Sequence, residues 1–163
     1  MAFPLWKRFV KSALMALFLL WPSLTAVHAA DDMNFPSELL TIVSAGGKKH
    51  QFLVELATTG PQRERGLMYR RQMDGDAGML FDFEVSRPVM MWMKNTELSL
   101  DMLFISDAGV IRKIHREAVP MSETIINSQS SVKYVLEING GRASALGIHE
   151  GDRVLSPQIG TMK

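Results

Sequence analysis

Apolar and polar residues alternate along several short stretches of the chain. Phe52, Val54 and Leu56, for example, fall on one side of an extended segment, and this period of two is typical of a half-buried strand. Segments with the composition of tight turns, such as Asp107-Ala108-Gly109, separate the stretches. The pattern predicts strands over residues 38–44, 50–57, 78–84, 88–94, 99–106, 110–116, 134–139 and 153–156.

Two short segments have helical signals instead. A threonine of Thr58-Thr59-Gly60-Pro61 can cap a helix, and the proline fits its first turn because the missing N–H needs no partner there. A second short helix is predicted over residues 142–146 and ends at Gly147. Many short strands with two short helices predict one compact α+β domain over residues 38–158, built on a mainly antiparallel, barrel-like sheet.

The predicted strands at 88–94 and 99–106 are close enough in sequence to pair as an antiparallel hairpin. In that register Trp92 lies opposite Asp101, and the two side chains share one face. A slip of one residue would bury charges and expose methionines, so the register is well specified. Glu97 is expected to be exposed at the hairpin tip. The opposite face is apolar and is expected to be buried; it consists of Met91, Met93, Leu100 and Met102.

Residues 1–29 have the pattern of a signal peptide. Basic residues precede an apolar stretch at 12–24, and small residues lead to a cleavage position after Ala29. The alternative is an uncleaved membrane anchor, but the apolar stretch is shorter than the ~20 residues that span a bilayer, and Pro22 interrupts it. We therefore expect an exported protein, periplasmic or secreted, with no stable membrane insertion after cleavage and a flexible leader at residues 30–37.

Charge and cysteine content exclude several classes of function. The full chain has 18 basic and 17 acidic residues and a formal net charge of +1. Residues 1–29 contain three of the basic residues and no acidic residue, so their removal leaves a net charge of −2. No basic face for nucleic acid follows from this balance. The absence of cysteine excludes disulfides, thiol catalysis and cysteine-based zinc sites.

One dense block places charged and aromatic residues inside an otherwise apolar region. It runs through Arg65-Gly66-Leu67-Met68, Gly78-Met79-Leu80-Phe81, Trp92-Met93-Lys94-Asn95-Thr96 and Leu98-Ser99-Leu100-Asp101. This spacing resembles the signature of domain-of-unknown-function family 192, small prokaryotic domains without an established activity. The resemblance covers roughly residues 41–155 and implies the same fold. The polar and sulfur-containing residues on signature positions are Arg65, Met68, Trp92, Lys94, Asn95, Thr96 and Asp101.

These residues have two interpretations. They can line a concave site with an aromatic floor, which would bind a small molecule, a glycan fragment or a peptide. Alternatively, Asp101 and Arg65 form a buried ion pair that only fixes the first helix onto the sheet. Glu137 is a second isolated charge in an apolar strand, and it also lies on a signature segment. If its strand adjoins that of Asp101, the two carboxylates can act as an acid–base pair; otherwise Glu137 accepts backbone N–H groups or pairs with an arginine.

The sequence gives little support for a metal or a cofactor. Met91 and Met93 could hold a soft ion such as Cu(I), but core packing explains them without a metal. The three histidines outside residues 1–29 lie in separate segments, without the short spacing of a zinc site. We expect an exported binding module without metal or cofactor. The alternatives are a hydrolase-like enzyme that uses Asp101 and Glu137, or a purely structural or partner-binding domain; no oligomeric state is predicted.

Overall fold

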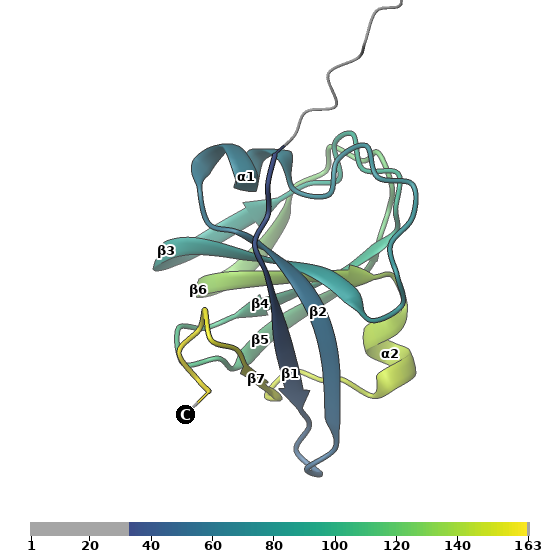
Figure 1. Ribbon diagram of the computed structural model, residues 1–163. Coiled ribbons are helices and arrows are strands. Elements are labelled where there is room, and N and C mark those ends of the chain that lie inside the picture. Colours follow the sequence, from purple (N-terminus) through teal and green to yellow (C-terminus); the bar gives the residue numbers. More distant parts are fainter. Residues whose placement is uncertain (1–32, 163) are drawn as a thin grey trace, which may run out of the picture. The chain divides into compact units, whose positions relative to one another are not determined.

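The computed structural model describes residues 33–162, so the predicted signal peptide at 1–29 lies outside the described residues (Figure 1). The described residues form mostly strands, with two short helices. In chain order the elements are β1 (Ser37–Val43), β2 (Lys49–Ala57), α1 (Gly60–Arg65), β3 (Ala77–Met91), β4 (Leu100–Ile105), β5 (Ile111–Ala118), β6 (Ile126–Asn139), α2 (Arg142–Leu146) and β7 (Arg153–Leu155).

All seven strands belong to one half-barrel sheet in the order β5-β4-β6-β3-β2-β1-β7. The sheet is mixed, because β2 and β3 are parallel while the other paired strands are antiparallel. Parallel neighbours need a crossover connection, and the segment containing α1 provides it. In Figure 1, β1 and β2 cross steeply over β3 and β6, and α1 lies above these two strands.

The hairpin expected between residues 88–94 and 99–106 is not formed. β6 lies between β3 and β4 and pairs antiparallel with both. The sequence prediction was wrong because it began this strand at residue 134, whereas β6 begins at Ile126. A single long strand, β3, also replaces the two strands expected over 78–94.

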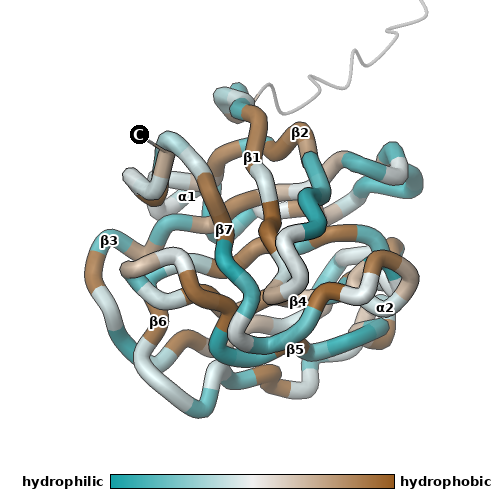
Figure 2. The backbone as a smooth tube through the Cα atoms, turned by 90° about the horizontal axis from the view of Figure 1, so that it is seen from below, coloured by the Kyte–Doolittle hydropathy of each residue, from teal (hydrophilic) through white to brown (hydrophobic). Residues whose placement is uncertain are grey.

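The sheet has an apolar core on each face, because side chains alternate along the strands. Figure 2 shows hydrophobic and hydrophilic residues interspersed along the chain. On β6, Leu136 and Ile138 enter the first core, which also contains α2 through Ala143. Val135 enters the second core, together with Met79 of β3. In the second core, Met93, Leu100 and Met102 are buried as expected, but Met91 is only partly buried; Glu97 is exposed.

Local sequence explains where α1 begins and ends. Thr59 accepts a hydrogen bond from the backbone N–H of Gln62, and the Gln62 side chain accepts one from the backbone N–H of Thr59, which forms a capping box. Gly66 ends the helix with a φ of 46°, in the left-handed region that glycine adopts without strain. A side chain at this position would also press on the ring of Phe81.

Residues 33–36, expected to be part of a flexible leader, are attached to the domain. The backbone oxygen of Asn34 accepts a hydrogen bond from Gln62, and that of Pro36 accepts one from the N–H of Leu56. Phe35 packs against the second core. Among residues 33–162, no helix has the length and apolar character required to cross a membrane.

Candidate functional site

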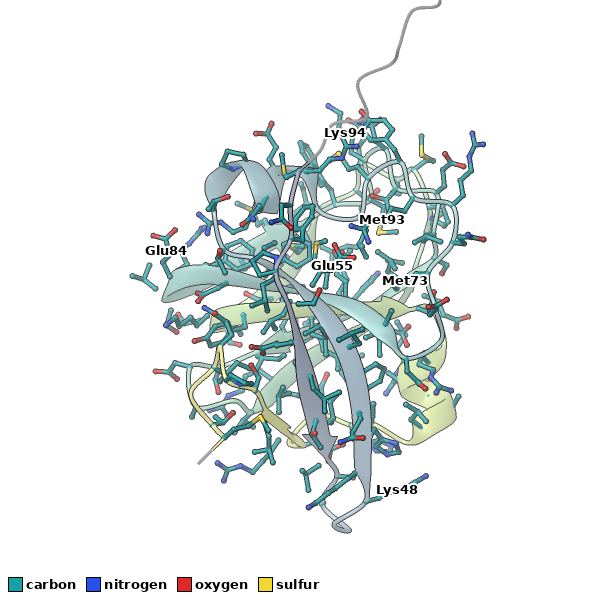
Figure 3. The ribbon with its side chains drawn as sticks, in the orientation of Figure 1. Lys48, Glu55, Met73, Glu84, Met93 and Lys94 are labelled. Atoms are coloured by element: carbon teal, nitrogen blue, oxygen red, sulfur yellow. The ribbon has the colours of Figure 1, made fainter. Side chains whose placement is uncertain are left out.

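A hollow of two adjoining chambers lies between α1 with the turn that follows it and the segment from the end of β3 to Thr96. The inner chamber has a volume of about 130 Å³ and the outer chamber about 410 Å³. The residues that line both chambers are Glu64, Arg65, Met68 and Trp92. Figure 3 shows Lys94, which lines the outer chamber, at the opposite end of the domain from Lys48.

Apolar side chains form most of the inner wall. Phe81 and Phe83 come from β3, as do Met90 and Met91 at its end. Met90 is 71% exposed and Trp92 is 43% exposed. These side chains therefore form an accessible apolar surface at the entrance of the hollow.

Two hydrogen-bonded residues with unusual backbone conformations, Tyr69 and Asn95, hold the rim of the outer chamber in place. The backbone N–H of Tyr69 donates to the backbone oxygen of Asn95 at 2.8 Å, and the Asn95 side-chain amide donates to the Tyr69 hydroxyl group at 3.0 Å. Both residues have positive φ, 66° and 54° respectively, a conformation that is uncommon for residues other than glycine. Such positions persist where the surrounding structure fixes them, often at binding sites.

The segment after β3 is fixed although it is not a strand. The N–H of Met93 donates to the backbone oxygen of Ser122, and the N–H of Met121 donates to that of Thr96. The Thr96 hydroxyl group also donates to the backbone oxygen of Lys94 at 3.1 Å. These bonds position Trp92 and Lys94, whose ammonium group lies 5.2 Å from the centre of the indole.

Glu137 is the charged residue at the base of the inner chamber. It lies on the central strand β6, opposite Met79 on one side and Met102 on the other, and only 4% of its surface is exposed. Within residues 33–162, no hydrogen bond or ion pair reaches its carboxyl group. Burial raises the pKa of the Glu137 carboxyl group to about 8. The group is therefore mainly protonated at neutral pH and has an unused O–H donor.

Gly78 allows β3 to approach the backbone of Glu137 closely. A Cβ atom at this position would lie 2.6 Å from the backbone oxygen of Glu137 and 3.1 Å from a methyl carbon of Ile138. Both distances are shorter than ordinary van der Waals contacts. The glycine in the signature segment 78–81 thus fixes the position of the strand that carries the buried carboxyl group.

Asp101 has a structural environment and does not line either chamber. It is fully buried, and its carboxylate accepts hydrogen bonds from the backbone N–H groups of Glu117, Gly141 and Ala143 at 2.8–3.0 Å. Two of these donors belong to the beginning of α2, whose own N-cap residue supplies no side-chain bond. Asp101 therefore caps α2 from β4.

The structure brings together most of the predicted site and separates one residue from it. The predicted residues that line the chambers are Arg65, Met68, Trp92, Lys94, Asn95 and Thr96. Asp101 lies neither opposite Trp92 nor in an ion pair with Arg65, because the inserted strand β6 replaces the expected partner. Arg65 instead lies over the ring of Tyr69, with its guanidinium carbon 4.7 Å from the ring centre.

Sequence reasoning missed several wall residues. Tyr69, Phe83 and Met90 have no motif of their own, although Met90 precedes Trp92 by two positions and so shares its face in an extended segment. No group of three or more histidine, cysteine, aspartate or glutamate residues within 33–162 is arranged to hold a metal ion.

Comparisons with known proteins give a family and structural relatives. The model of the family DUF192, described as an uncharacterized ACR, matches residues 41–156. A crystal structure from Sinorhizobium meliloti 1021, provisionally described as a transcription regulator, is 55% identical with a TM-score of 0.75, and the match covers 76% of this chain and 96% of that chain. A protein of unknown function from Novosphingobium aromaticivorans DSM 12444 is 34% identical with a TM-score of 0.73, covering 80% and 91% respectively. The comparison with curated proteins finds no match.

Proposed function

The chain belongs to DUF192, a family described as uncharacterized, and from the geometry of the site we propose that it is an exported binding module that holds a small ligand in the two-chamber hollow. The ligand contacts Met68 and Trp92, which line both chambers, and extends from Lys94 at the rim to Glu137 at the base. Glycan fragments and short peptides remain within this proposal, as do other small molecules that fit the chambers.

The observation that carries the proposal is the unpaired carboxyl group of Glu137. A buried polar group without a partner costs free energy of folding, and its neighbours across the strands, Met79 and Met102, are apolar. Core packing alone favours an apolar side chain at such a position. A ligand that accepts a hydrogen bond from Glu137 accounts for both the residue type and its opening into the inner chamber.

Export is the second part of the proposal, and it rests on the signal pattern of residues 1–29. N-terminal sequencing of the protein recovered from the periplasm or the culture medium tests it. We expect a mature chain that begins at Ala30. Recovery of a chain with an intact Met1, confined to the cytoplasm, would contradict export without affecting the binding site.

The hydrolase-like alternative loses its basis because it required Asp101 and Glu137 in one cleft. Asp101 lines neither chamber and already accepts three backbone hydrogen bonds. Glu137 therefore lacks the carboxylate that this alternative assigned to it as a partner. The geometry therefore favours binding over hydrolysis by the pair Asp101 and Glu137.

Thermal unfolding with a chemically varied ligand set tests the binding function. A ligand that binds only the folded protein raises its Tm. We expect some compounds to stabilise the full-length wild-type chain and the control Val85→Ala, which changes an exposed apolar residue outside both chambers. The same compounds should have little effect on Trp92→Ala and Glu137→Met. The proposal fails if the wild-type protein unfolds cooperatively but no compound raises its Tm. It also fails if the compounds raise the Tm of both variants as much as that of wild type.

A further inference from the structure

The rim of the outer chamber has a cation without a carboxylate partner. Within residues 33–162, the ion pairs join other residues, and Lys94 takes part in none of them. Its ammonium group lies over Trp92, where the indole face contributes to holding it at the entrance. A bound anion next to this group would gain a charge-assisted contact on a surface that is already ordered.

The other charged groups that line the chambers come mainly from α1. Arg63, Glu64 and Arg65 of α1 line the inner chamber, but Arg63 is paired with Glu84 at 2.9 Å. Arg65 lies over the ring of Tyr69, and Glu64 is the exposed carboxylate that lines both chambers. The remaining titratable groups are the Tyr69 hydroxyl group at the rim and Glu137 at the base.

The base of the inner chamber offers a hydrogen-bond donor. Burial raises the pKa of Glu137 to about 8, so at neutral pH its O–H can donate to a ligand oxygen. Between the base and the rim, the walls are apolar and aromatic. The inner chamber of about 130 Å³ is close to the ~150 Å³ of a cavity that admits one benzene ring.

We propose that the ligand is a small organic anion: a carboxylate that lies beside Lys94, joined to an apolar body that packs on Trp92 and Met68, with an oxygen at its inner end that accepts a hydrogen bond from Glu137. This inference rests on the proposed binding function and assigns its ligand class. An amine would be disfavoured at either end of the hollow. At the rim it would face the Lys94 ammonium group, and at the base it would require an ionised Glu137.

Isothermal titration calorimetry with three matched probes tests the ligand class on the full chain. The probes are 3-(4-hydroxyphenyl)propanoate, its amide and tyramine, which share a hydroxyphenyl body and differ in charge. We expect the carboxylate to bind about tenfold more tightly than the amide, the gain of one charge-assisted contact, and tyramine to bind most weakly. Lys94→Ala should abolish the preference for the carboxylate over the amide, whereas the control Lys48→Ala, on an exposed hairpin, should keep it.

A second arm tests the contact with Glu137. For this arm the probe is the methyl ether 3-(4-methoxyphenyl)propanoate, whose ether oxygen can only accept a hydrogen bond. From about pH 6 to about pH 9, its affinity for wild type should fall as Glu137 loses its proton near pH 8. Glu137→Gln keeps a donor that does not titrate, so its affinity should stay nearly constant. A flat profile for wild type, or equal slopes for both proteins, would remove Glu137 from the inference.

The failures of the inference and of the binding function are distinguishable. Tighter binding of tyramine than of the carboxylate, or binding of uncharged or cationic members of the wider ligand set in preference to its carboxylates, would overturn the anionic class while the binding function stands. Failure of all three probes together with the whole ligand set would overturn the binding function itself.

Discussion

Glu137 and Asp101 lie on neighbouring strands of one sheet, yet their side chains leave it on opposite faces. In the ladder between β4 and β6, Glu137 pairs with Met102 and Asp101 pairs with Ile138. Residues that are directly opposite share a face, and successive residues alternate. Glu137 therefore belongs to the face of the second core and the hollow, and Asp101 to the face of the first core. Their different environments lead to opposite expectations for substitution.

Asp101→Asn should destabilise the protein without changing ligand binding. One oxygen of the carboxylate accepts two backbone hydrogen bonds and the other accepts a third. In asparagine an amide nitrogen replaces one of these oxygens, and it cannot accept a hydrogen bond. An unmet buried donor costs about 1–3 kcal/mol, and the cap of α2 also loses its charge. Denaturant unfolding of wild type and Asp101→Asn measures the loss in unfolding free energy. Asp107→Asn, at an exposed turn position, is the control. Wild-type stability of Asp101→Asn would contradict the structural role.

The stability of the protein should fall as pH rises through the titration range of Glu137. The pKa of its carboxyl group is raised from 4.5 to about 8 by burial, so between these values the folded state binds more protons than the unfolded state. The free energy of unfolding then decreases with pH, by at most about 1.4 kcal/mol per pH unit from this one group. The stabilising contribution is complete below pH 4.5 and is lost by about pH 8.

Comparison with Glu137→Gln isolates this contribution, because the amide does not titrate. Denaturant unfolding of both proteins at a series of pH values gives the difference in unfolding free energy. We expect the difference to shift in favour of the glutamine variant as pH rises towards 8. A difference that does not change with pH would mean that Glu137 titrates normally in the folded protein.

Glu137→Met should stabilise the protein while removing ligand binding. The methionine has a similar length and matches Met79 and Met102 across the neighbouring strands. It relieves the cost of a buried polar group without a partner, about 1–3 kcal/mol. Denaturant unfolding at neutral pH measures the gain, and the ligand screen measures the loss. Strong destabilisation would show that Glu137 serves the folded state, and the argument for a ligand would fail.

The sequence predicts the local elements of this fold better than their pairing. The alternation at Phe52, Val54 and Leu56 and the capping signals near Thr59 depend on neighbouring residues, so they are visible in the chain itself. The insertion of β6 between β3 and β4 depends on contacts between distant segments. Residues 127–131, near the beginning of β6, are all polar, so the sequence there lacks the alternation that reveals a strand.

The candidate site was predictable where a residue type conflicts with its surroundings. Trp92 and Lys94 in an apolar region, and Glu137 in an apolar strand, stand out for this reason, and all three line the hollow. Asp101 gives the same signal, yet it caps α2, because buried carboxylates serve backbone N–H groups as well as ligands. Without the strand order, sequence alone does not separate these two uses.

Gly78→Ala should destabilise the sheet at the strand that carries Glu137. The added methyl group would meet the backbone oxygen of Glu137 at 2.6 Å, so β3 and β6 must separate locally. Overpacking of this kind costs about 1–3 kcal/mol. Gly75→Ala is the matched control, because its added methyl group meets no atom within 4 Å. Equal unfolding midpoints for the two variants would show that β3 and β6 do not depend on this close approach.

Trp92 should report directly on ligand binding by its fluorescence. The chain contains three tryptophans, and two of them, Trp6 and Trp21, lie in the predicted signal peptide. In a full-length chain with Trp6→Phe and Trp21→Phe, Trp92 is the remaining indole. It is 43% exposed and lines both chambers, so acrylamide should quench its emission efficiently in the free protein.

A ligand that occupies the hollow covers the indole and removes water from it. Its addition should therefore shift the Trp92 emission to shorter wavelength and reduce quenching by acrylamide, with the same concentration dependence as the rise in Tm. Lys94→Ala leaves the indole in place but removes the cation above it, so the change should then need a higher concentration of an anionic ligand. Unchanged emission from Trp92 while a ligand raises the Tm would locate binding elsewhere on the protein.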